Sequence, residues 1–118
     1  MRGKLKAIPS SLREKKRYVA FEVLSKDKMD IDPVKKAIED SLKEYTGLLG
    51  LSKANLYVLK DKWNSEKQKG ILRVNNKMLE QLKASFSLIK EVNGNKAVIN
   101  SVGVSGILKK CEKKYLAC

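Results

Sequence analysis

The chain has 118 residues, the size of one ordinary domain, and 42% of them are apolar, which is enough for a hydrophobic core. It carries 26 Lys and Arg against 13 Asp and Glu and has no His, so its net charge is +13. The composition excludes a wholly disordered chain, and no stretch approaches the roughly 18 consecutive apolar residues of a membrane span. Because the first residues also lack the apolar region of a signal peptide, we expect a soluble, cytoplasmic protein.

The positive charge is concentrated at the two ends of the chain. The first 17 residues have a net charge of +6 and residues 105–118 have +3, whereas the 87 residues between them carry only +4. Solubility does not require this segregation, but binding to a polyanion does. Nucleic acid is therefore the favoured partner, with an anionic membrane or an acidic protein as the alternatives.

The sequence contains no recognisable catalytic or metal-binding motif. It has no P-loop, no G-x-S-x-G segment and no His for acid–base work. Cys111 and Cys118 are expected to be reduced thiols, because on one helix they would lie about 10 Å apart. Asp27, Asp30 and Asp32 lack the Gly and the final Glu of a calcium loop and fit a helix cap and a solvated turn better. We expect neither a catalytic centre nor a resident metal.

The first half of the chain predicts a strand, a helix and a second strand. Residues 17–24 are rich in β-branched and aromatic side chains, as strands are. Asp32-Pro33 offers an N-cap and a first-turn proline for an amphipathic helix over residues 33–46, which Gly47 would end. Residues 55–60 predict the second strand, followed by a polar turn.

The second half predicts a strand, a helix, a strand and a final helix. Residues 70–75 predict the third strand, after which Asn75 or Asn76 would cap the second helix. Asn93-Gly94 predicts a tight turn into a fourth strand over residues 97–104. Ser105 would then cap a terminal basic helix. The glycines at this junction, Gly103 and Gly106, serve either turn geometry or the close approach of backbone N–H groups to phosphate.

This βαββαβ order predicts an α+β, ferredoxin-like or RNA-recognition-like sandwich with an antiparallel sheet and a C-terminal basic helix. We expect a basic arm over residues 1–16 and a single domain over residues 17–118.

The third strand lacks the aromatic residues with which such sheets usually stack bases. Lys69, Gly70 and Val74 match the RNA-recognition consensus, but its three aromatic positions hold other residues, namely Ile71, Arg73 and Asn76. Strand alternation places Ile71 and Arg73 on the outer face, so this face is not expected to be a conventional base-reading surface. We expect a face that contacts a partner protein instead, formed by Tyr18, Ala20 and Ile71.

Four segments together resemble the archaeal ribonuclease P protein component 2 family, of the Pop-five type: residues 12–21, 69–75, 85–94 and 104–116. The resemblance implies a subunit that is not catalytic alone and that binds and stabilises the catalytic RNA. The complex would remove 5′ leaders from precursor tRNA with Mg²⁺, the chemistry lying in the RNA and no cofactor being bound by the protein. The implied partners are ribonuclease P RNA, precursor tRNA and a TIM-barrel-like protein subunit, and self-association as a homodimer stays open.

The resemblance also implies which residues contact RNA. Ile107 stands where the family's V-S-G motif often continues with Thr, so no hydroxyl role is carried over to it. The residues that we expect to contact RNA are all basic: Arg13, Lys15, Lys16, Arg17, Arg73, Lys109, Lys110, Lys113 and Lys114.

Two other functions remain open. One is a protein–protein scaffold, and the other is a ribosomal or RNA-modification accessory protein that binds RNA generally.

Overall fold

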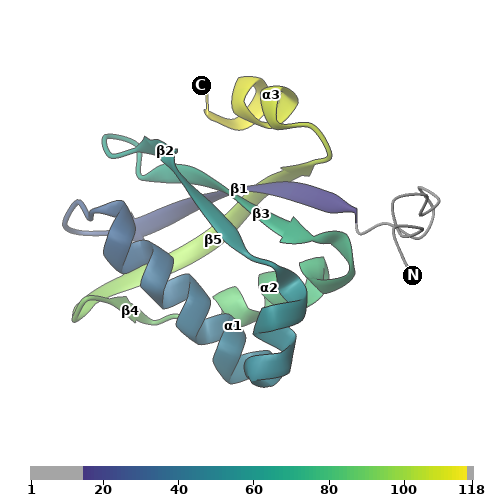
Figure 1. Cartoon of the computed structure of the whole chain (residues 1–118). Helices are drawn as coiled ribbons and strands as arrows, with labels where there is room; N and C mark the ends of the chain where they lie inside the picture. The colour runs from purple at the N-terminus through teal and green to yellow at the C-terminus, as the bar shows by residue number, and fades with distance from the viewer. Residues whose placement is uncertain (1–14, 117–118) are drawn as a thin grey trace, which may run out of the picture.

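The computed structural model describes residues 15–116, and Figure 1 shows how the elements follow one another. Arg13 and Cys118 lie outside the described residues, so the expectations for them have no structural counterpart. The elements are β1 (Lys16–Ser25), α1 (Ile31–Ala54), β2 (Tyr57–Asn64), β3 (Lys69–Asn75), the 3-10 helix η3 (Asn76–Met78), α2 (Leu79–Phe86), β4 (Glu91–Val92), β5 (Asn95–Ser105), α3 (Leu108–Cys111) and the π-helical turn η4 (Glu112–Leu116).

The strands form one antiparallel sheet in the order β2-β3-β1-β5-β4. The central strand β1 has β3 on one side and β5 on the other, as in the expected ferredoxin-like plan. The short strand β4 is an addition at the edge of that plan, where it pairs with the first residues of β5. The predicted fold class is confirmed.

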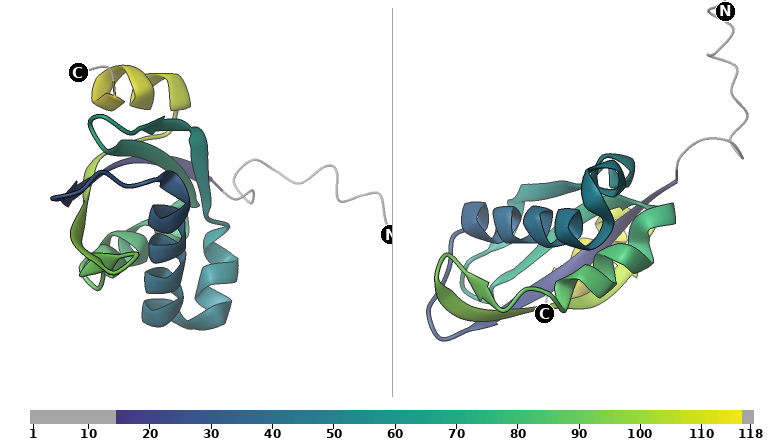
Figure 2. Two further views of the ribbon diagram at one scale, coloured as in Figure 1. Left: turned by 90° about the vertical axis from the view of Figure 1, so that its left-hand side faces the viewer. Right: turned by 90° about the horizontal axis from the view of Figure 1, so that it is seen from below.

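The main core lies between the sheet and the two helices α1 and α2, which cover the same face of the sheet (Figure 2). Side chains of β1 alternate between the two faces, so Val19, Phe21 and Val23 all point into this core. Ile38 and Leu42, one turn apart on α1, pack against them and are fully buried. Truncating such a side chain to Ala would cost about 2–5 kcal/mol of stability.

Helix α1 begins earlier than the sequence suggested, at Ile31, and Asp30 rather than Asp32 is its N-cap residue. Asp32 instead lies in the first turn, where a negative charge is favoured by the helix dipole. Its carboxylate lies 2.7 Å from the Lys60 ammonium of β2, and this ion pair lowers the pKa of Asp32. The expected capping role of Asp32 was therefore wrong, because the helix begins at Ile31 and places Asp32 inside its first turn.

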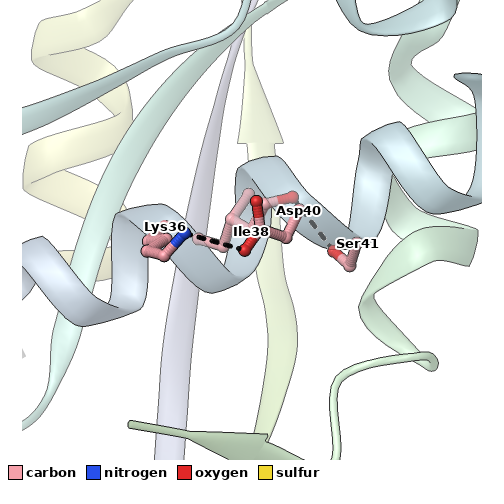
Figure 3. Close-up of polar contacts among 4 residues, drawn as sticks. All are labelled: Lys36, Ile38, Asp40 and Ser41. Carbon is pink, nitrogen blue, oxygen red and sulfur yellow. Dashed lines mark hydrogen bonds and ion pairs between the residues drawn. The ribbon is translucent and has the colours of Figure 1, made fainter. Parts of the chain in front are cut away.

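Local contacts on both the exposed and the buried side of α1 stabilise the helix, as Figure 3 shows. Lys36 and Asp40, one turn apart, form an exposed ion pair of 3.4 Å, and the Ser41 hydroxyl donates a hydrogen bond to the Ile38 carbonyl. Gly47 interrupts the helix with a φ of 81°, a conformation that glycine adopts without strain. The break falls where the sequence predicted the end of the helix, but the chain then resumes a helical path to Ala54.

The other boundaries agree with the sequence to within a few residues. The second strand extends to Asn64, beyond the expected end at residue 60. Asn75 caps the following helical segment through its side chain, which accepts a hydrogen bond from the Lys77 backbone N–H. Asn93 and Gly94 both have positive φ angles and form the expected tight turn before β5.

The opposite face of the sheet is covered by the terminal helix, by which we mean α3 together with η4 (Figure 2). The helix presents Leu108, Cys111 and Tyr115 to the sheet, and there they form a second, smaller apolar cluster with Ala20 and Ile71. Tyr115 lies directly over Gly103 of β5, so closely that a Cβ atom at that position would overlap the ring. Gly103 is thus needed for the close approach of the helix to the sheet.

Candidate nucleic-acid interface

The first basic group lies where β1 begins. Lys15 and Lys16 are exposed, while Arg17 is half-buried and donates a hydrogen bond from Nη1 to the Lys16 carbonyl at 3.0 Å. The backbone beneath them is fixed, because the Lys15 carbonyl accepts a hydrogen bond of 2.7 Å from the Asn76 N–H. The two lysine side chains therefore extend into solvent from a rigid strand end.

The second basic group lies on the solvent side of the terminal helix. Its members are all exposed, because the residues that alternate with them face the sheet. Keeping a lysine side chain solvated in this position costs little free energy. An ammonium group at such a surface can bind a phosphate. The group consists of Lys109, Lys110, Lys113 and Lys114.

The two groups start at the same end of the sheet. Antiparallel pairing of the first and last predicted strands would place residue 17 near residue 104, and the structure confirms this, because Tyr18 pairs with Ser105 in the β1–β5 ladder. Gly106 follows immediately, and a Cβ atom there would lie 3.7 Å from Nη1 of Arg17. The N-terminal basic group and the entry to the terminal helix are therefore neighbours.

The helix then carries its lysines away from that end. Lys109 and Lys113 line a shallow hollow together with Asp61 and Trp63 of β2, two strands away from β1. The proximity of residues 17 and 104 predicted that the two basic groups would merge into one patch. This prediction was wrong in part, because the terminal helix crosses the sheet toward β2 instead of projecting from its end. The basic residues extend from the start of β1 across the covered face to β2.

An ion pair holds the helix in this crossing position. Lys62 of β2 contacts the Glu112 carboxylate, and both side chains are about one-third exposed. Hydrogen bonding and charge attraction from Glu112 raise the pKa of Lys62. The pair neutralises the acidic residue of the helix, which leaves the surrounding lysines to dominate its surface.

The face that we expected to contact a partner protein is not open. Ala20 is 1% exposed and Ile71 is fully buried beneath the terminal helix, and Tyr18 is partly buried at its margin. The expectation of an exposed face was wrong, because the terminal helix of the same chain packs on the outward-facing apolar residues of β1 and β3. A protein could contact Ala20 and Ile71 only if the terminal helix moved.

Arg73 lies at the edge of the covered area, on the expected outer face. Its guanidinium carbon is 5.2 Å from the ring centroid of Tyr57, the residue opposite it on β2. Tyr57 was not singled out from the sequence, because its approach to Arg73 depends on the register of β2 against β3. The only signal was its place one residue before the buried Val58, which predicts an outward side chain.

Residues 15–116 contain no group of three or more His, Cys, Asp or Glu side chains that could hold a metal ion. Within the same part of the chain, no helix has the length and apolar character needed to cross a membrane. What these residues do provide is an RNA-recognition-like fold with an extended basic surface.

The comparisons with known proteins place the chain in a family. The Rpp14/Pop5 family model matches residues 17–116, so the chain belongs to that family. Ribonuclease P protein component 2 of Thermococcus gammatolerans is 39% identical, over 99% of this chain and 96% of that protein. The protein of the same name from Pyrococcus furiosus is 37% identical, over 95% of this chain and 92% of that protein. The family implied by the sequence motifs is confirmed.

A solved structure supports the fold. A chain in the cryo-EM structure of yeast ribonuclease MRP superposes with a TM-score of 0.62, covering 89% of this chain and 88% of that chain. Its sequence identity is only 14%, so this likeness speaks for the architecture alone.

Proposed function

We propose that this chain is a protein subunit of ribonuclease P and that its two basic groups bind and stabilise the catalytic RNA. One observation carries the proposal: pairing of β1 with β5 brings Arg17 beside Gly106, so the first basic group adjoins the start of the terminal helix that carries the second. The near full-length similarity to proteins named ribonuclease P protein component 2 supports the identity of the complex.

The physical role of the basic groups would be to reduce repulsion between RNA phosphates. Each lysine that neutralises a phosphate releases condensed counterions, which favours binding and makes it depend on salt. Such contacts position a protein on RNA without reading its sequence. A subunit of this kind stabilises a compact RNA fold rather than selecting a short motif.

In this proposal the cleavage chemistry belongs to the RNA. The holoenzyme would remove 5′ leaders from precursor tRNA in the cytoplasm, with Mg²⁺ bound by RNA and no cofactor bound by the protein. Any direct contact with precursor tRNA would use the same basic surface.

A second role, holding another protein subunit, is favoured by a different surface. Leu24 and Val98 are paired across β1 and β5, and their side chains are 51% and 50% exposed. We infer that this exposed apolar pair is the part of the sheet that another protein covers. A TIM-barrel-like ribonuclease P subunit is the proposed occupant, and a second copy of this chain is the alternative.

The decisive experiment is purification of the tagged full-length chain from its native cells, followed by sequencing of the bound RNA and identification of the bound proteins. Enrichment of ribonuclease P RNA is expected. Enrichment of ribosomal RNA or of a modification guide RNA instead would favour the accessory-protein alternative. Recovery of protein partners without RNA would favour the scaffold alone.

A further inference from the structure

Tyr57 is a large aromatic side chain that the fold leaves more than half exposed. It lies at the start of the edge strand β2, and 54% of its surface is exposed. The guanidinium of Arg73 lies over one face of the ring, with its carbon 5.2 Å from the ring centroid. A tyrosine held in this way by a cation has a defined orientation and still presents ring surface to solvent.

The register of the sheet explains why this ring is open. Leu59, Ile71 and Ala20 are opposite one another on β2, β3 and β1, and the terminal helix covers this row. The next row toward the start of β1 consists of Tyr57, Arg73 and Tyr18. This second row lies at the margin of the terminal helix. The helix therefore covers the first row and leaves part of the second row exposed to solvent.

The open row borders the first basic group. Lys16 precedes Tyr18 by two residues, so it lies on the same face of β1, and it is opposite Asn75 of β3. Its ammonium group is exposed, as is that of Lys15. An aromatic ring, a guanidinium and an ammonium group therefore occur together at one corner of the sheet.

We propose that Tyr57 and Arg73 form a stacking site for one unpaired nucleobase of RNA, with Lys16 close enough to contact a neighbouring phosphate. A flat base can stack on the ring face that Arg73 does not cover, and the guanidinium over the opposite face adds a cation–π contribution and positive charge. Stacking of this kind tolerates any base, so the site would recognise an unpaired nucleotide without selecting its sequence. This inference rests on the proposed RNA-binding function and adds a single-stranded contact to it.

The chain offers a well-matched control for this site. Tyr45 on α1 is 52% exposed, nearly the same fraction as Tyr57, but lies on the layer across the sheet from the terminal helix. The two residues differ in their surroundings and hardly at all in their exposure. Tyr45→Ala therefore removes an equal amount of exposed aromatic surface without touching the site.

The test uses the full-length protein and two labelled RNA probes of nearly the same total charge, an oligoadenylate of about twenty nucleotides and a blunt duplex of about ten base pairs. Binding is measured by fluorescence anisotropy at several salt concentrations. Tyr57→Ala and Tyr57→Leu should weaken oligoadenylate binding by roughly tenfold, while Tyr57→Phe keeps the ring and should bind as the wild type does. None of these variants, nor Tyr45→Ala, should alter duplex binding, because a duplex offers no unpaired base.

Thermal unfolding of each variant checks that the fold is retained, which the exposure of Tyr57 favours. Equal affinity of Tyr57→Ala and the wild type for oligoadenylate would overturn the stacking site, as would equal losses for oligoadenylate and duplex. In either case wild-type binding to RNA would leave the proposed function standing. Failure of the wild-type protein to bind either probe would instead contradict RNA binding itself and the stacking site with it. A crosslink from a 4-thiouridine oligonucleotide to Tyr57 would support the site independently.

Discussion

The thiol of Cys111 donates a hydrogen bond to the backbone carbonyl of Tyr18, with 3.8 Å between sulfur and oxygen. This contact joins the terminal helix to the central strand of the sheet, 93 positions earlier in the chain. Cys111 is buried, and its burial, with a smaller effect of the Glu112 charge, raises the pKa of the thiol to about 11. The thiol is therefore a reporter of whether the helix lies on the sheet.

Cys111 should react slowly with thiol reagents while the terminal helix is docked. A thiol with a pKa of about 11 is about 0.1% ionised at pH 8, and only the thiolate is a good nucleophile. In a Cys118→Ser background, which leaves one thiol, modification of the folded protein should be slower than that of the urea-unfolded protein by about 100-fold. Equal rates in the two states would mean that the helix spends much of its time away from the sheet.

Raising the pH should destabilise the folded protein through the same thiol. In the unfolded chain the thiol ionises near its ordinary pKa of 9.0, whereas the folded state retains the proton up to about 11. The unfolded state therefore loses protons first, and the free energy of unfolding falls between these two pH values. Urea unfolding at intervals from pH 8 to pH 11 should show this decline. Cys111→Ala should decline less steeply, although loss of the Lys62–Glu112 ion pair still contributes in both proteins as Lys62 deprotonates.

Gly103→Ala should displace the terminal helix by a steric route. The new Cβ atom would overlap the ring of Tyr115, which has to move for the alanine to fit. Overpacking of this kind costs about 1–3 kcal/mol, and we expect faster Cys111 modification to accompany the loss of stability. Gly106→Ala is the matched control, since its Cβ would meet only Arg17 at an ordinary contact distance of 3.7 Å. A Gly103→Ala protein with unchanged thiol protection would show that the helix does not depend on this contact.

The periodicity of the sequence predicted the elements of the fold well, because the main core is formed by one face of the sheet and by the apolar sides of the helices that pack on it. Apolar alternation over Val19, Phe21 and Val23 and the helical spacing of Ile38 and Leu42 both reflect burial in the same layer. The order of these elements then restricts the topology to very few arrangements.

The terminal helix could not be placed in the same way. Its pattern predicts an apolar side containing Cys111 and Tyr115, but the sequence does not say which surface that side covers. Ala20 and Ile71 looked like an exposed face for the same reason: strand alternation assigns residues to a face without saying whether that face is open. The proximity of Tyr57 to Arg73 likewise depends on a register that neither strand encodes alone.

The isolated protein should not cleave precursor tRNA, even with Mg²⁺ present. The chain has no His, and residues 15–116 contain no cluster of side chains fit to hold a metal ion. Cleavage should be assayed with protein purified under denaturing conditions and refolded, to remove contaminating RNA and nucleases. A protein preparation that still releases the 5′ leader after this treatment would place catalytic groups in the chain and contradict RNA-based chemistry.

The basic surface should determine how strongly RNA binding depends on salt. Changing Lys15, Lys16, Lys109 and Lys110 together to Ala removes two residues from each basic group. If each contacts a phosphate, the slope of log affinity against log salt should fall by about three. Folding should be nearly unaffected, because solvated lysines contribute little to stability.

A control variant with the same net charge separates specific contacts from a general electrostatic effect. Lys43, Lys83, Lys90 and Lys96 are also exposed, but Lys43 lies on α1, Lys83 on α2, and Lys90 and Lys96 beside β4 and the start of β5, at the end of the β1–β5 ladder opposite to Tyr18 and Ser105. Changing these four residues to Ala lowers the charge equally and should leave the slope almost unchanged. If both quadruple variants reduce the slope to the same extent, only total charge matters to binding. The assignment of the two basic groups to RNA contact would then have to be withdrawn, whereas a loss confined to the first variant would locate the phosphate contacts on these groups.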